Sequence, residues 1–186
     1  MKQRLGTTGL TLSRALAAGA AAGVAGGLAE VAYMGVYSHL TGMEAAGILR
    51  LVTFTFFDAG VSFGPNGPLL GLLIHFALSL AIGLSFGLFA RYALPRFTYT
   101  RALVWGLVSL AAIWAMNFYI ILPEYNMAFV RLVSPEAALF SKLSFGVLLA
   151  IVMKLFCTAG RKAAPAPSTG RRDAPVPSRC APSTTT

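Results

Sequence analysis

Charged and chemically reactive side chains are scarce in this chain of 186 residues. Asp, Glu, Lys and Arg make up 11% of it, whereas an ordinary soluble domain carries about 25% charge. Histidine and cysteine occur twice each. Cys157 and Cys180 lack the spacing of metal ligands, so they do not indicate a metal site. Both follow the last apolar run, in a segment expected to be cytoplasmic, where thiols stay reduced, so no disulfide is expected. Apolar residues, by contrast, make up 56% of the chain. This composition excludes a soluble globular protein.

The apolar residues gather in runs of about 20, the length that an α-helix needs to cross a bilayer. The sequence therefore predicts an all-α, polytopic membrane bundle over residues 15–157. Ser134 as N-cap and Pro135 at the first helical position favour the start of its last span. The loop around Pro95 is short, so the second and third spans are expected to be antiparallel neighbours. The expected spans are residues 15–37, 68–89, 102–122 and 135–156.

The formal net charge of +9 does not indicate a nucleic-acid partner, because the basic residues alternate with the spans. They lie before the first span, between the second and third, and after the fourth. The intervening segments, residues 38–67 and 123–136, are nearly neutral. By the positive-inside rule, both termini are cytoplasmic, and the expected location is a bacterial inner membrane. The alternating cations are Lys2, Arg4, Arg14, Arg91, Arg96, Arg101, Arg161, Lys162, Arg171, Arg172 and Arg179.

The outer segment of residues 42–57 is more than a connection between spans. Thr41-Gly42-Met43-Glu44 has the spacing of a capping box, and the apolar run that follows contains one charge, Arg50. At about 14 residues this run is too short to span. We expect a short interfacial or re-entrant helix, with a role either in packing or as a gate. Its surface anchors are Phe54, Phe56, Phe57 and Phe63.

The two ends of the chain differ from the bundle in composition. Residues 1–14 form a basic cytoplasmic segment, and the first span that follows also fits a secretory signal loosely. If that span were cleaved, three spans would remain. Residues 158–186 consist mainly of Ala, Pro, Ser, Thr and Arg, which predicts a disordered cytoplasmic tail that contacts anionic headgroups.

Small residues recur every four positions along the first two spans. Such stripes permit close approach of helix backbones in a bilayer, where the hydrophobic effect does not drive helices together. The stripes are expected to pack on each other or on a second copy of the chain. The first consists of Gly19, Gly23 and Gly27, and the second of Gly71, His75, Ser79, Gly83 and Gly87.

Each span also carries one strongly polar residue at a similar depth. On an ideal helix Glu30 lies about 20° from Gly19, so it points into the packed face. Glu30 and His75 each lie about 10 Å from the outer end of their spans, and Asn117 and Lys142 lie at comparable depth. An ionisable residue within a span is by default a functional-site hypothesis. Glu30, His75, Asn117 and Lys142 are therefore expected to form an intramembrane cluster in the outer leaflet.

Several roles are open for this cluster. It can fix helix register, as buried polar groups sometimes do, or Lys142 can reach the outer surface and leave it. It can also bind a proton or solute, since histidine changes its charge near neutral pH. A copper site is a further alternative because thioether and imidazole suit Cu(I), with His39, His75 and Met34 as speculative ligands. No triad or cofactor motif is present, so we expect no enzyme and no cofactor.

The order of these features resembles a family of small bacterial inner-membrane proteins with four spans. The resemblance covers residues 15–156 and implies topology but no activity. It depends on the Gly-rich first span, Thr41-Gly42-Met43-Glu44, Gly71, Ile74-His75-Phe76, Gly83, Gly87, Trp105-Gly106 and Ile121-Leu122-Pro123.

Two classes of function follow from the sequence. The first is an accessory or structural component that uses its small-residue faces within a larger membrane complex. The second is a small transporter or proton-linked protein that uses the outer-leaflet cluster. A chain of this size would then require a homo-oligomer. In both classes the bilayer is a partner and nucleic acid is not.

Overall fold

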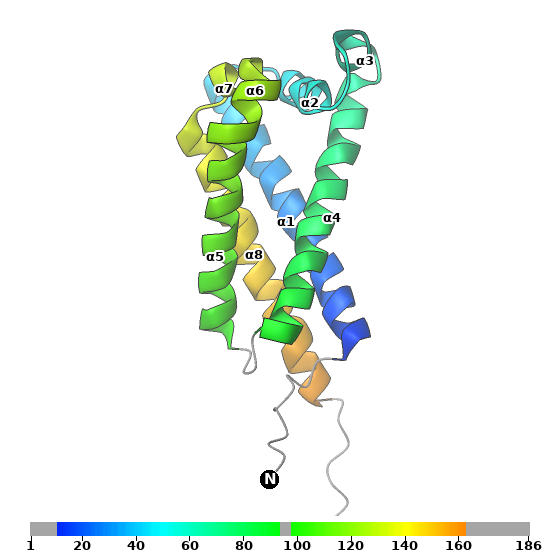
Figure 1. The fold of residues 1–186 in the computed structure, drawn as a ribbon, viewed down its shortest axis with the longest axis vertical. Coiled ribbons are helices and arrows are strands. Elements are labelled where there is room, and N and C mark those ends of the chain that lie inside the picture. The colour runs from blue at the N-terminus through cyan, green and yellow to red at the C-terminus, as the bar shows by residue number, and fades with distance from the viewer. Residues whose placement is uncertain (1–10, 94–97, 163–186) are drawn as a thin grey trace, which may run out of the picture.

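A computed structural model describes residues 11–93 and 98–162, and within these residues it contains helices and no strand. The four long helices are α1 (Leu12–Thr41), α4 (Gly67–Ala93), α5 (Tyr99–Met116) and α8 (Pro135–Lys162) (Figure 1). Four helical stretches are long and apolar enough to cross a membrane, because α5 continues without a break to Tyr125. The prediction of an all-α bundle with four candidate membrane spans is confirmed.

The long helices run past the expected spans at most of their ends. The predicted cytoplasmic segment extends to residue 14, but α1 begins at Leu12. The predicted tail begins at residue 158, but α8 continues to Lys162. Residues 1–10 and 163–186 lie outside the described part of the chain, as do residues 94–97 around Pro95.

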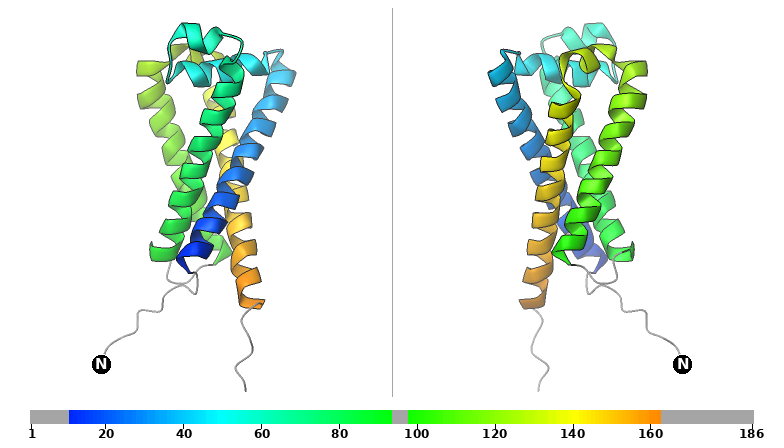
Figure 2. Two further views of the ribbon diagram at one scale, coloured as in Figure 1. Left: turned by 90° about the vertical axis from the view of Figure 1, so that its right-hand side faces the viewer. Right: turned by 90° about the vertical axis from the view of Figure 1, so that its left-hand side faces the viewer.

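Both ends of the described chain lie at one end of the bundle (Figure 1). This terminal end contains the start of α1 and α5 and the end of α4 and α8. The opposite, loop end contains four short helices, one of which, α6, continues from α5 (Figures 1 and 2). They are α2 (Ala45–Phe54), α3 (Ala59–Phe63), α6 (Leu122–Tyr125) and α7 (Met127–Leu132).

Side chains at the starts of three of the long helices accept hydrogen bonds from backbone N–H groups that have no partner within the helix. The Thr11 and Thr98 hydroxyls each lie 3.4 Å from the backbone nitrogen of the arginine three residues further on, in the first turn of α1 and α5. The Ser134 hydroxyl lies 3.2 Å from the backbone nitrogen of Ala137, and Pro135 is the first residue of α8. The predicted N-terminal signal of the last span is confirmed.

The predicted capping box at Thr41 and Glu44 is wrong. Thr41 is the last residue of α1, and its hydroxyl donates to the carbonyl of Tyr37 at 2.8 Å. Gly42 ends α1 in the left-handed conformation (φ 70°), which suits glycine. Glu44 is the N-cap of α2 and makes no side-chain capping bond. The four residues therefore end one helix before they begin another, and the glycine decides the outcome.

The helix α1 packs against both α4 and α8, and α8 also packs against α5. The views in Figure 2 show α1 crossing α4 and diverging from it toward the loop end. The consecutive helices α4 and α5 are antiparallel, as expected, but they share little packing. An edge-to-face contact between Phe89 and Trp105, with ring centroids 5.6 Å apart, joins them. The main packing partner of α4 is α1, which is not its neighbour in sequence.

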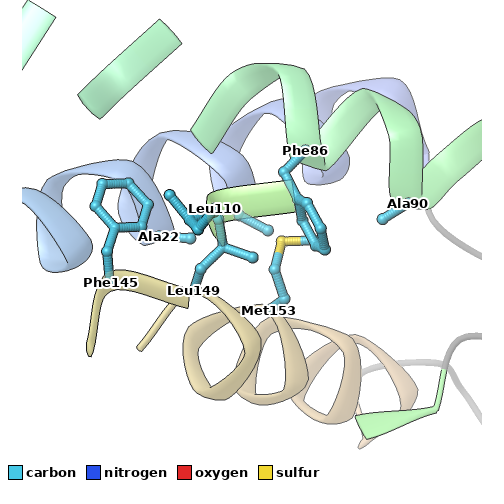
Figure 3. Close-up of a cluster of buried hydrophobic side chains, with 8 residues drawn as sticks. Ala22, Phe86, Ala90, Leu110, Phe145, Leu149 and Met153 are labelled. Atoms are coloured by element: carbon cyan, nitrogen blue, oxygen red, sulfur yellow. The ribbon is translucent and has the colours of Figure 1, made fainter. Parts of the chain in front are cut away.

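A core of buried apolar side chains unites the four long helices (Figure 3). Its larger members are fully or almost fully buried between the ribbons. The aromatic rings fill the space that alanine leaves on facing helices, as tight packing requires. The cluster consists of Ala18, Ala22, Phe86, Ala90, Leu110, Phe145, Leu149 and Met153.

A π-helical turn, η1 (Asn117–Ile121), interrupts the regular winding between α5 and α6. Its hydrogen bond joins the N–H of Leu122 to the carbonyl of Asn117. Pro123 follows directly, and proline has no N–H to donate to the carbonyl four residues earlier. The wider turn is one of the usual adjustments at such a position.

Candidate functional site

The site is built on the contact between α1 and α4. A Cβ atom added to Gly19 would lie 2.5 Å from the carbonyl oxygen of Gly83, and one added to Gly23 would lie 2.5 Å from that of Ser79. A Cβ atom added to Gly87 would likewise meet the carbonyl oxygen of Ala15. Successive contacts thus move four residues forward along α1 and four residues backward along α4. The two stripes pack on each other within one chain, and only glycine fits at these positions.

The stripes change partner toward the loop end. Gly27 faces the Ser79 side chain, and a Cβ added to this glycine would lie 2.9 Å from the serine Oγ. Gly71, expected to face α1, instead packs against the Leu49 carbonyl on α2. Gly26 lies outside both stripes and faces the Phe145 ring of α8. Because glycine allows close packing, α4 and α8 both contact α1 at the same stretch, one turn before Glu30.

Glu30 is the one acidic residue of the described long-helix interiors, and its side chain is 3% exposed. The ammonium of Lys142, on α8, lies 2.7 Å from Oε1 and donates a hydrogen bond to Oε2 at 2.9 Å. Lys142 is 24% exposed and so is less deeply buried than its partner. A carboxylate removed from water needs a partner of opposite charge, and Lys142 supplies it.

His75 approaches the same carboxylate from α4. Its Nε2 lies 3.1 Å from the carbonyl oxygen of Gly27 and 3.8 Å from Oε2 of Glu30. Because a carbonyl oxygen can only accept a hydrogen bond, Nε2 carries a proton in this contact. The 3.8 Å separation is too long for a hydrogen bond to Glu30. A charged imidazolium at this position would nevertheless be attracted to the carboxylate.

The other predicted polar residue does not join this group. Asn117 is the first residue of η1, is half-buried, and makes no side-chain hydrogen bond to Glu30, His75 or Lys142. We name Glu30, His75 and Lys142 the polar cluster. It joins α1, α4 and α8 but not α5, and three of the four expected helices contribute to it.

Of the speculative copper ligands, Met34 and His39 lie on α1 and His75 lies on α4. His75 contacts Gly27, whereas His39 lies twelve residues further along the same helix, about 18 Å at 1.5 Å per residue. Met34 lies about 10 Å from Gly27 on the same scale. These distances do not bring the three side chains to one ion. Within the described part of the chain, no group of three or more His, Cys, Asp or Glu side chains is placed to hold a metal.

Asn126 is a structurally important polar residue that the sequence did not reveal. It precedes α7, is 2% exposed, and donates from Nδ2 to the Leu51 carbonyl at 2.6 Å and the Thr55 hydroxyl at 2.9 Å. Its Oδ1 accepts a hydrogen bond from the N–H of Phe129 at 3.1 Å. Asn126 thus joins α7 to the end of α2 across 71 or more residues of sequence. Its only local signal is that asparagine is a common N-cap.

Replacement of Asn126 by alanine is expected to lower the free energy of unfolding by about 2 kcal/mol, because buried partners lose their hydrogen bonds. Thermal unfolding in mild detergent measures the effect. Asn66→Ala is the matched control, since Asn66 is exposed and, among the described residues, its side chain makes no hydrogen bond that links helices. Equal stability of the two variants would contradict this role for Asn126.

Fold and site together define an all-α helical bundle of membrane-spanning dimensions with an ionised pair among its long helices. Comparison of the chain with protein-family models, with curated proteins and with solved structures found no match. The function is therefore inferred from the residues of the chain and their geometry.

Proposed function

We propose that the chain is a multi-pass protein of the bacterial inner membrane with its terminal end in the cytoplasm. The distribution of charge supports this orientation. Described cations at the terminal end include Arg14, Arg91, Arg101 and Lys154, whereas described acids outside the polar cluster belong to the loop end. The resemblance to small four-span bacterial membrane proteins supports the same topology.

Within that membrane we propose a proton-linked function centred on the polar cluster. The observation that carries the proposal is that two titratable side chains, from α8 and α4, approach the buried carboxylate of Glu30. Lys142 alone balances the charge of Glu30. His75 is an additional titratable group that charge balance does not require. Polar and ionisable residues in spans are costly, and proton relays are among their established uses.

The geometry defines what one proton would do. With Glu30 ionised and Lys142 charged, the pair is formally neutral. A proton can be added to Glu30 or to the Nδ1 atom of His75, since Nε2 already donates to Gly27. Either addition raises the charge of the cluster by one. Addition to Glu30 also removes the negative charge that holds α8 to α1 through Lys142, so proton binding is linked to helix packing.

The glycine stripes support an accessory role less than the sequence suggested. They are used within the chain, between α1 and α4, and so do not offer a small-residue face to a partner. They instead bring His75 to the level of Gly27 and Glu30. A homo-oligomer, which a transporter of 19.6 kDa would require, must then form through other surfaces.

An accessory role in a larger membrane complex is the second candidate. It is favoured by exposed aromatic side chains at the loop end, where Phe56, Phe57 and Phe63 are 46–56% exposed. Interfacial aromatic residues also anchor proteins in lipid. In this role the polar cluster would fix helix register only.

Proton flux into liposomes separates the two candidates. We expect the purified protein, reconstituted with a pH-sensitive dye inside, to admit protons under an imposed potential. Glu30→Gln is expected to reduce the flux at least about tenfold, because the amide cannot exchange a proton. Glu44→Gln is the matched control, since Glu44 is exposed and outside the long helices. Wild-type flux equal to that of empty liposomes would contradict the proton-linked function, as would full flux through Glu30→Gln.

A further inference from the structure

Each of the four long helices places at least one cation near the terminal end. Arg14 on α1 and Arg91 on α4 each lie within a turn or so of the close contact between Ala15 and Gly87. On the other side of the bundle, Arg101 lies in the first turn of α5 and Lys154 on α8. The Lys154 ammonium lies 4.9 Å from the ring centroid of Tyr99, which joins the two helices at this level.

The described residues of the terminal end carry a net positive charge. The acids of the described chain lie elsewhere, with Glu30 in the polar cluster and the rest at the loop end, namely Glu44, Asp58, Glu124 and Glu136. The loop-end cations, Arg50 and Arg131, thus share their end of the bundle with acids. The net positive charge of the described terminal end attracts anions.

The surroundings of the cations indicate the kind of anion. Large apolar side chains next to them are exposed, including Tyr92 at 72% and Leu155 at 59%. A soluble anion or a nucleic acid would leave these side chains in water. A phospholipid would cover them with acyl chains while its phosphate met the cations, and basic residues at a membrane surface are attracted to anionic lipid in this way.

We infer that Arg14, Arg91, Arg101 and Lys154 form a binding surface for the headgroups of anionic phospholipids. The surface needs the bundle to be membrane-inserted but does not depend on proton linkage at Glu30. It takes its ligand from the bilayer leaflet that faces the terminal end. Binding should weaken as salt is raised, because screening reduces attraction between exposed charges.

Native mass spectrometry of the detergent-purified full chain tests this surface, with phosphatidylglycerol and phosphatidylcholine as the two probes. Wild type is expected to bind phosphatidylglycerol at least about tenfold more tightly. The triple variant Arg91→Gln, Arg101→Gln and Lys154→Gln is expected to lose about a hundredfold in affinity, since each cation near a surface contributes about fivefold.

Two control variants separate lipid binding from folding. Arg91→Lys with Arg101→Lys keeps the charge and is expected to retain affinity within about threefold. Arg131→Gln removes an exposed cation at the opposite end and is expected to leave affinity unchanged. The inference would be overturned if wild type bound both lipids equally, if the triple variant bound phosphatidylglycerol like wild type, or if an RNA oligonucleotide competed phosphatidylglycerol off the protein.

Discussion

Replacement of Gly83 by leucine is expected to separate α1 from α4 and to lower the free energy of unfolding by about 3 kcal/mol or more. A Cβ at this position would meet the carbonyl oxygen of Gly19 and would lie 2.5 Å from the Cα of Gly23. Both are backbone atoms, which cannot rotate away as a side chain can. The helices must move apart, and the Gly27 contact of His75 is lost with them. Unfolding in mixed detergent micelles, followed by circular dichroism, measures the change.

Gly35 supplies the matched control for this substitution. It lies in α1, as Gly19 and Gly23 do, but a Cβ added to it would have no atom within 4 Å in the described structure. Gly35→Ala is therefore expected to leave stability unchanged or to raise it slightly, since alanine is the better helix former. If Gly83→Leu were as stable as Gly35→Ala, the close contact of the two glycine stripes would be refuted.

Replacement of Lys142 by methionine is expected to cost about 3–5 kcal/mol, the usual effect of removing one partner from a buried ion pair. Methionine keeps a long flexible side chain but removes the ammonium that contacts both carboxylate oxygens of Glu30. The carboxylate, 3% exposed, would then have His75 as its nearest cation-forming group at 3.8 Å. Chemical unfolding in micelles measures the loss.

Adding Glu30→Gln to the Lys142→Met variant is expected to recover most of that stability. The second substitution removes the charge that the first one left without its partner, and coupled residues are non-additive in this way. The double variant is therefore predicted to be more stable than Lys142→Met alone. Additive losses from the two substitutions would show that Glu30 and Lys142 act independently, contrary to the observed contact.

Features with a regular spacing could be predicted from the sequence. The long apolar runs predicted the four long helices because their length and composition suffice for a membrane span. A spacing of four placed the glycines on one face, and the depth of Glu30, His75 and Lys142 brought the three to one level. The face on which each residue lies follows from helix periodicity, and its depth follows from its distance to the end of the span. Both can be read from the local sequence.

Features that depend on tertiary contact could not be predicted. Asn117 is expected at a depth comparable to that of Glu30, but it makes no side-chain hydrogen bond to the polar cluster, because depth does not fix the direction in which a helix turns a side chain. Gly71 follows the stripe in sequence yet faces α2, since α1 diverges from α4 before that point. Asn126 has hydrogen-bond partners 75 and 71 residues away in the sequence, and no local sequence pattern predicts a contact between such distant residues.

The outer segment illustrates how two local signals compete. The spacing of Thr41 and Glu44 favours a capping box, but Gly42 between them favours the left-handed end of the preceding helix. Because α1 continues to Thr41, the threonine hydroxyl bonds back to Tyr37 and is not free to cap α2. A short helix still forms at residues 45–54, as the apolar run predicted, though its start differs.

The most direct measurement is the proton flux of the double variant Glu30→Gln, Lys142→Met in liposomes, made on protein whose helicity and unfolding have first been compared with wild type. If the polar cluster binds the transported proton, this variant is folded and nearly as stable as wild type but admits protons at least about tenfold more slowly. If the cluster only fixes helix register, the folded variant retains the flux of wild type, and a proton-linked function centred on the polar cluster is wrong.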